Sequence, residues 1–226
     1  MSATDNLLGI GIYTPAQAAH YARVPTQLVN RWIHGSKQGD AVITPQLKDS
    51  SDRIVTFLDW VQTLAIRAIR RHKKIPLPKI REAINVARRD LEIEFPFAMN
   101  HKIYLFDDKI FIDVKKKRWH QLTGKFKGQG LFPIAEPFMT ELSYSDEGLA
   151  KLYQAFSHGR LSVIMDPTFH FGHPYVDSCK QTTQALYHAY KTEGSQEAAA
   201  EVLGVTVEEV GMAIRYEDYL GGPIAA

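Results

Sequence analysis

The sequence predicts a mainly α fold with small β-hairpins, an α+β chain in which two helix-turn-helix modules are joined by a basic helical and β middle. Three observations support this prediction. Capping residues and short apolar repeats indicate one helical pair near residues 14–35 and a second near 183–219. Between them, apolar residues recur first at the period of a helix and then at the alternating period of strands.

The 226-residue length has room for one large domain or two to three small modules. The 45% hydrophobic and 23% charged residues are typical of a globular protein, which excludes a disordered tail, a collagen and a disulfide scaffold. We expect three parts: a helix-turn-helix domain over residues 1–50, a basic helical and β-hairpin connecting region over 51–160, and a second helix-turn-helix domain over 161–226.

Three features of the sequence predict a cytoplasmic protein. No apolar run approaches the roughly 18 residues of a membrane helix. The first residues lack the basic segment and long apolar stretch of an export signal. The single cysteine, Cys179, has no second thiol with which to form an internal disulfide, as expected in a reducing compartment.

The first helical pair begins at Thr14, an N-cap residue that forms a capping-box pattern with Gln17. We expect a first helix over 15–22 and a second that runs to His34 and ends at Gly35. The apolar residues expected to anchor the second helix are Val29, Trp32 and Ile33.

Four polar residues lie on the outward side of that second helix: Thr26, Gln27, Asn30 and Arg31. Glutamine and asparagine can each make two hydrogen bonds to adenine in the major groove, and arginine can do so with guanine. The pattern therefore predicts DNA binding. The alternative is an ordinary helical hairpin whose polar residues face water.

A long helix is expected after a loop that contains a short wing strand at residues 41–44. Its N-cap is predicted among Ser50, Ser51 and Asp52. Trp60 and Ile66 fall outside its main apolar stripe, which indicates a second buried face or a dimer contact. The stripe itself consists of Ile54, Phe57, Leu58, Val61, Leu64, Ala65 and Ala68.

The formal net charge of +2 hides a division along the chain. The acidic and basic residues of 1–52 are equal in number, residues 53–127 carry a net charge of +10, and residues 128–226 carry a net charge of −8. Arg70 and Arg71 lie near the end of the long helix, and we expect them to contact DNA phosphates together with a basic helix over 78–91. Simple segregation of surface charge is the alternative.

The remaining segments are shorter. A β-hairpin is predicted from 103–106 and 110–114, followed by a solvated basic run at 115–118. The other expected elements are a short helix at 132–138, a second hairpin from 142–144 and 150–153, a strand over 161–167, and helices over 183–193, 196–203 and 206–219.

The last helices form a second helix-turn-helix by shape. Residues 182–220 hold two basic and seven acidic residues, so repulsion from phosphate favours dimerisation or protein contact over DNA binding.

Metal binding and catalysis have little support in the sequence. Two histidines three residues apart in a loop match neither a zinc-finger pair nor an H-E-x-x-H arrangement. No Gly-rich phosphate loop or nucleophile elbow occurs, so we expect no metal, no cofactor and no enzymatic activity. The residues considered for a zinc site are Asp166, His170, His173, Asp177 and Cys179.

The chain as a whole resembles a bacterial antitoxin family of the VapB type, in which a MerR-like amino-terminal helix-turn-helix precedes a small carboxy-terminal antitoxin domain. It departs from the family at Cys179–Gln181, where a later glycine of a Gly-x-Pro-x-x-x-Gly pattern is often found. The segments that carry the resemblance are Tyr13–Ala19, Arg31–Gly35, Thr56–Asp59, Lys79–Ala83, Val163–Pro167, Phe171–Val176, Glu193–Ala199 and Ala213–Glu217.

The resemblance implies a non-enzymatic protein that binds and neutralises a PIN-like ribonuclease toxin. It also implies a dimer that represses its own operon by binding operator DNA through Thr26, Gln27, Asn30 and Arg31. The alternative is a stand-alone MerR-like transcription regulator. Its rear domain would dimerise or sense a small ligand in the loop over 169–175.

Overall fold

The computed structural model contains helices and two four-stranded sheets, which confirms the predicted α+β class. Its contacts divide the chain into two compact units. The first contains the described residues of 1–13, 141–143 and 151–225, and the second those of 14–140 and 144–150. The structure describes residues 10–37, 39–47, 53–73, 75–106, 109–113, 119–121, 132–133 and 141–222. No described helix has the length and apolar character needed to cross a membrane.

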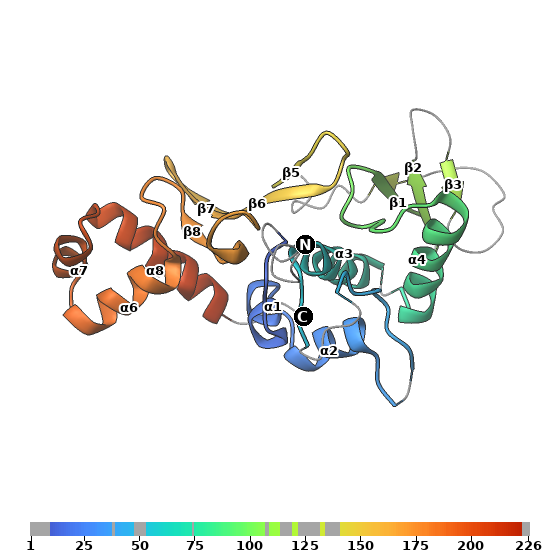
Figure 1. The fold of residues 1–226 in the computed structure, drawn as a ribbon, viewed down its shortest axis with the longest axis horizontal. Helices are drawn as coiled ribbons and strands as arrows, with labels where there is room; N and C mark the ends of the chain where they lie inside the picture. The colour runs from blue at the N-terminus through green and yellow to red at the C-terminus, as the bar shows by residue number, and fades with distance from the viewer. Residues whose placement is uncertain are drawn as a thin grey trace, which may run out of the picture. The chain divides into compact units, whose positions relative to one another are not determined.

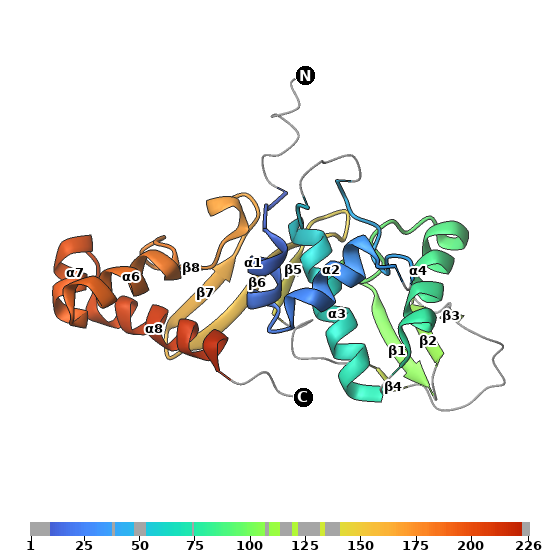
Figure 2. The ribbon, with the colours of Figure 1, turned by 90° about the horizontal axis from the view of Figure 1, so that it is seen from below.

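The second unit opens with two short helices. Helix α1 (Pro15–Tyr21) begins at the predicted capping box, because the Thr14 hydroxyl accepts from the Gln17 amide and the Gln17 side chain accepts from the Thr14 amide. Helix α2 (Thr26–His34) ends at Gly35, where φ is 75° and a Cβ would lie 3.0 Å from a backbone nitrogen. Val29, Trp32 and Ile33 are buried, as predicted. Both helices lie beside α3 (Figure 2).

The segment after α2 forms no wing strand, so the prediction for residues 41–44 is wrong. The amides of Val42 and Ile43 both donate to the carbonyl of Trp32, at 2.7 and 2.8 Å. That carbonyl lies in the last turn of α2, where backbone acceptors lack helical partners. The segment therefore caps a helix end in place of pairing with another strand.

Helix α3 (Phe57–Lys73) begins later than a cap among Ser50–Asp52 would allow, so that prediction is wrong. Thr56 is the cap: its hydroxyl accepts from the Asp59 amide at 3.2 Å, and the Asp59 carboxylate accepts from the Thr56 amide at 3.3 Å. Trp60 and Ile66 are fully buried, which confirms the second buried face of this helix.

Helix α4 (Leu77–Leu91) contacts the first sheet, whose strand order is β3-β2-β1-β4. Strands β1 (Lys102–Phe106) and β2 (Lys109–Asp113) form the predicted antiparallel hairpin. Strand β3 (Trp119–Gln121) pairs with β2. The basic run at 115–118 lies outside the described residues.

The helix predicted to start at Phe132 is wrong over its first two residues. Phe132–Pro133 form strand β4, which pairs antiparallel with Tyr104 and Leu105 of β1. A two-residue strand at the edge of a sheet tolerates proline, because its missing N–H need not join a ladder on both sides. Residues 134–138 lie outside the described part of the chain.

The second sheet has the order β5-β6-β7-β8 and confirms the predicted second hairpin and the strand after it. The first unit also holds three helices, which pack together beside β7 and β8 (Figure 1). The strands are β5 (Leu142–Tyr144), β6 (Ala150–His158), β7 (Leu161–Met165) and β8 (Tyr175–Val176), and a 3-10 turn spans His170–Gly172.

The three carboxy-terminal helices begin where the sequence predicts them. The side chains of Thr182, Ser195 and Thr206 each accept from a backbone amide of the first helical turn. Thr206 also forms the predicted reciprocal capping box with Glu209. The helices are α6 (Thr183–Glu193), α7 (Gln196–Leu203) and α8 (Val207–Gly221).

Candidate nucleic-acid interface and partner surfaces

The outer face of α2 presents three of the four predicted DNA-contacting residues to solvent. Thr26, Gln27 and Arg31 are exposed, whereas Asn30 is half-buried. The buried face of the helix, anchored by Trp32, holds these polar side chains outward. This is the geometry that a helix needs to place side chains against base edges in a major groove.

Asn30 is less available than its three neighbours. Its amide nitrogen donates to the Thr26 carbonyl at 3.1 Å, and its side-chain oxygen accepts from Arg53 Nη1 at 3.4 Å. Both functional groups that would pair with adenine are therefore engaged within the protein. Contact between Asn30 and a base uses the second N–H and the second lone pair of this amide, or else exchanges these hydrogen bonds.

Arg53 is a further cation of this surface, and no motif in the sequence marks it. It lies beside Asn30, although it is 23 residues away in the chain. It also lies close enough to His34, in the last turn of α2, that its charge affects the histidine. Burial, followed by the positive charge of Arg53, lowers the pKa of His34 below its ordinary value. Only the fold brings these residues together, so no spacing rule could have found Arg53.

Arg70 and Arg71 lie on the face of α3 that approaches the α1–α2 turn. Arg67 Nη1 donates to the carbonyl of Ala22 in that turn at 2.6 Å. Residues three and four positions apart share a helix face, so Arg70 and Arg71 project on the same side as Arg67. Both are exposed, and Arg70 also donates to the carbonyl of Ile75 at 3.1 Å.

The arginines of α4 differ from the phosphate-binding face that the sequence predicts. Arg81 donates to the carbonyls of Asp40 and Ala41, at 2.5 and 3.0 Å, and Arg88 donates to the Thr44 hydroxyl. These bonds hold the loop after α2 against α4. Arg89 forms an exposed ion pair with Asp90 at 2.6 Å. Much of the basic charge of this helix therefore has a structural partner.

The first unit carries a strained loop at the 3-10 turn. His170 and Phe171 both have positive φ, at 47° and 54°, which costs free energy in residues that have a Cβ. The Tyr13 hydroxyl donates to the Gly172 carbonyl at 2.8 Å, and the Ile12 amide donates to the Phe171 carbonyl at 2.9 Å. These two hydrogen bonds hold the backbone of the loop, while the Phe171 side chain is 60% exposed.

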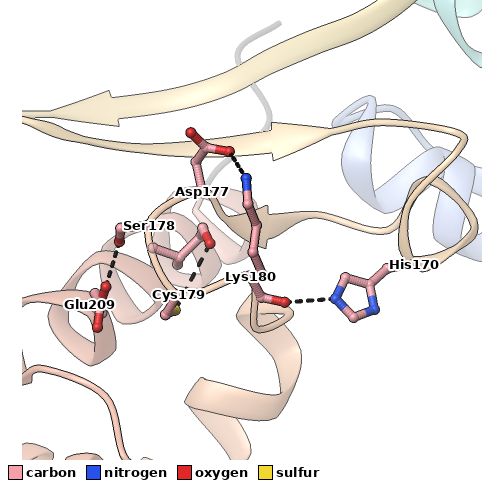
Figure 3. Close-up of polar contacts among 7 residues, drawn as sticks. His170, Asp177, Ser178, Cys179, Lys180 and Glu209 are labelled. Atoms are coloured by element: carbon pink, nitrogen blue, oxygen red, sulfur yellow. Dashed lines mark hydrogen bonds and ion pairs between the residues drawn. The ribbon is translucent and has the colours of Figure 1, made fainter.

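The second half of this loop is held by polar contacts, shown in Figure 3. His170 Nε2 lies 2.7 Å from the Lys180 carbonyl, and since a carbonyl only accepts, this nitrogen carries the proton. Lys180 Nζ pairs with Asp177 at 2.5 Å, and the Ser178 hydroxyl donates to Glu209 at 2.5 Å. Burial raises the pKa of Glu209, but hydrogen bonds from Ser178 and Thr206 outweigh it and hold the pKa below its ordinary value.

Three of the residues considered for a zinc site have partners or surroundings of another kind. Asp177 forms an ion pair with Lys180. Nε2 of His170 carries a proton and donates it to the carbonyl of Lys180. Burial raises the pKa of the Cys179 thiol, which disfavours the thiolate that a metal or a nucleophilic reaction needs. Within the described residues, no three His, Cys, Asp or Glu side chains are grouped as a metal would require.

The chain is similar to known proteins in both sequence and fold. The chain is 23% identical, over 89% of its length and 91% of the relative's, to a Mycobacterium tuberculosis protein described as "putative antitoxin VapB45". Its fold matches the crystal structure of Rv2018 from Mycobacterium tuberculosis with a TM-score of 0.62 and 17% identity, over 92% of this chain and 99% of the other. No protein-family model matches the chain.

Proposed function

We propose that this protein is the antitoxin of a type II toxin-antitoxin system. It binds and neutralises a PIN-like ribonuclease toxin, and as a dimer it represses their shared operon by binding operator DNA in the cytoplasm. The observation that carries the proposal is the similarity to the relative named above, which extends over nearly the whole length of both chains. The protein itself acts as a binding partner and catalyses no reaction.

In this proposal α2 is the helix that enters the major groove. Its exposed Gln27 and Arg31 supply donors and acceptors that can distinguish bases. Arg70 and Arg71, on the side of α3 next to the α1–α2 turn, contact the phosphate backbone. Phosphate contacts position the protein along the duplex, and base contacts select the sequence.

The toxin binds the acidic first unit. Its segments 141–143 and 151–225 hold 10 acidic and five basic residues, so this part of the chain repels nucleic acid. Its helices also expose apolar side chains: Val202 is 64% exposed and Tyr219 is 43% exposed. Exposed apolar residues rimmed by charge are typical of surfaces that bind another protein.

Co-expression with each flanking gene tests the proposal. We expect a flanking gene product to be toxic alone, to be harmless when expressed with this protein, and to co-purify with it at a fixed ratio. The purified pair should bind DNA from upstream of its own operon more tightly than a scrambled duplex of equal length. If the protein binds this DNA but binds neither flanking gene product, it is a stand-alone regulator instead.

The strained loop at His170–Gly172 favours that stand-alone regulator as the second candidate. Backbone strain and two exposed phenylalanines, Phe169 and Phe171, are features of ligand-binding loops as well as of protein interfaces. A ligand-sensing regulator would show a rise in melting temperature with a small molecule and without any protein partner. If no small molecule raises the melting temperature and a toxin complex forms, the ligand-sensing regulator is excluded in favour of the antitoxin.

A further inference from the structure

We infer that the first unit has a carboxylate-binding groove between the β6–β7 turn and helix α8, and that an acidic side chain of the protein partner occupies it. The groove is a cavity of about 520 Å³. It is lined by His158, Gly159, Arg160, Leu161, Gln196, Val207, Glu208, Gly211, Met212 and Arg215. The identity of the partner as the toxin rests on the proposed function.

One glycine in the lining lets two polar side chains approach the backbone of α8. Glu208, Gly211 and Arg215 follow the spacing of a single α8 face, and Gly211 in the middle of that face has no side chain. A Cβ at this position would lie 3.0 Å from Gln196 Oε1 and 3.2 Å from Arg215 Nη1. The polar ends of two long side chains therefore approach the helix backbone at this point.

Two arginines line the groove from different elements. Arg160 comes from the turn that joins β6 to β7, and Arg215 comes from α8. Both side chains belong to exposed residues, and neither has a hydrogen bond or ion pair with any other described residue. Glu208 is the acidic group of the lining, so the two arginines, Arg160 and Arg215, give the groove an excess of positive charge.

The chemistry of the lining favours a protein carboxylate over a nucleic acid. Arginine binds a carboxylate through two parallel N–H···O bonds. Leu161, Val207 and Met212 add apolar surface, which suits an aspartate or glutamate that has an aliphatic neighbour. The acidic surroundings repel a phosphate polymer but admit one carboxylate to the two guanidiniums. These two arginines are two of the five basic residues in 141–226.

The first experiment measures binding of the full chain to the toxin encoded beside it. We expect the charge-reversed variant R160E/R215E to bind at least tenfold more weakly, and R160Q/R215Q to bind more weakly as well. Lys151→Glu is the matched control, because Lys151 is an exposed cation of the same unit outside the groove. Circular dichroism and melting temperature confirm that each variant is folded. Unchanged affinity in both arginine variants overturns the groove and leaves the antitoxin function intact.

A second experiment tests the groove without the toxin. The full chain labelled with ¹⁵N is titrated with the peptide acetyl-Leu-Glu-Leu-amide and with its neutral counterpart acetyl-Leu-Gln-Leu-amide. We expect the Nε–H resonances of Arg160 and Arg215 to move with the glutamate peptide alone. Equal shifts with both peptides, or no shift, overturn the inference. A single-stranded oligonucleotide that displaces the peptide also overturns it, because the groove then binds phosphate. If the peptide binds but neither flanking gene product does, the carboxylate-binding groove is supported and the proposed antitoxin function is wrong.

Discussion

The Arg67 guanidinium donates a 2.6 Å hydrogen bond to the Ala22 carbonyl and so fastens the middle of α3 to the turn between α1 and α2. A charged hydrogen bond of this kind contributes about 1.5–3 kcal/mol. The same hydrogen bond fixes which face of α3 lies next to helices α1 and α2. The positions of Arg70 and Arg71 follow from this contact, and so does their proposed role at the phosphate backbone.

Arg31→Ala should weaken binding to operator DNA by about 1–3 kcal/mol if Arg31 contacts a base edge. The loss should be confined to the operator, because a base contact is absent on a scrambled duplex. Fluorescence anisotropy with both duplexes measures the difference. Arg89→Ala is a suitable control, since Arg89 is exposed on α4 and pairs with Asp90. An equal loss on both duplexes would reduce Arg31 to a phosphate contact.

Reversing Arg70 and Arg71 to glutamate should flatten the dependence of DNA affinity on salt. Each phosphate contact contributes about 0.9 to the slope of log K against log salt, so loss of two lowers it by roughly 2. The slope is measured between about 50 and 200 mM salt. Lys151→Glu and Lys191→Glu, on the first unit, should leave it unchanged. An unchanged slope in the arginine variant would show that this face of α3 meets solvent.

Arg53→Ala should raise the pKa of His34 toward its ordinary value. The arginine charge is the second cause of the lowered pKa, after burial, so its removal should restore only part of the difference. Titration of the His34 ring protons by NMR measures this change. The variant should also release the Asn30 side-chain oxygen. A His34 pKa that does not move would place the Arg53 charge too far from the ring to matter.

Asp59 should make the protein less stable as pH rises from about 4 to 6. Burial, partly offset by hydrogen bonds from Thr56 and Gln46, raises its pKa from 3.8 to about 6. The folded state therefore holds a proton that the unfolded chain releases in this range, and the free energy of unfolding falls by about 3 kcal/mol. Above pH 6 both states are ionised and the contribution is flat.

The Asp59→Asn variant isolates this effect, because asparagine cannot ionise, and its one oxygen, in the place of Oδ2, can still accept from both the Gln46 and Thr56 amides. Urea unfolding of both proteins at several pH values gives the difference between them. That difference should change in favour of the variant between pH 4 and 6. A constant difference would mean that Asp59 titrates normally in the folded protein.

Local sequence rules predicted the helices that carry their own start and stop residues. Thr14 with Gln17 and Thr206 with Glu209 are capping boxes that act within four residues, and both helices begin where these residues place them. Burial of Trp32 followed from the helical period in the same way. Such features depend on near neighbours alone and can be recognised without a fold.

Features that depend on distant partners were not predictable. Residues 41–44 have strand-forming side chains, but the amides of Val42 and Ile43 donate to the Trp32 carbonyl, and arginines of α4 donate to this loop. Arg81 and Arg88 lie on a basic helix face that the sequence cannot distinguish from a phosphate-binding one. The contact between Arg53 and Asn30 joins residues that are 23 positions apart in the chain. The groove likewise brings together Arg160 and Arg215, which are distant in the sequence.

Gly172→Ala should destabilise the first unit more than any exposed glycine substitution there. Gly172 has a φ of 85°, and a Cβ on it would run into the hydroxyl of Tyr13. The left-handed backbone costs about 1–2 kcal/mol in alanine. Displacement of Tyr13 also breaks its hydrogen bond to the Gly172 carbonyl, which adds about 1 kcal/mol.

Gly194→Ala separates the two causes. Gly194 has a similar φ of 81° at the end of α6, but nothing lies within 4 Å of the position that a Cβ would take. It should therefore incur the backbone cost alone. Chemical unfolding of the two variants, followed by near-ultraviolet circular dichroism, compares them directly. Because Tyr13 supports the loop that carries Phe171, the Gly172 variant should also lose the near-ultraviolet signal of this region before it loses its helices. Equal destabilisation of the two variants would show that Tyr13 moves aside freely and that the loop does not depend on it.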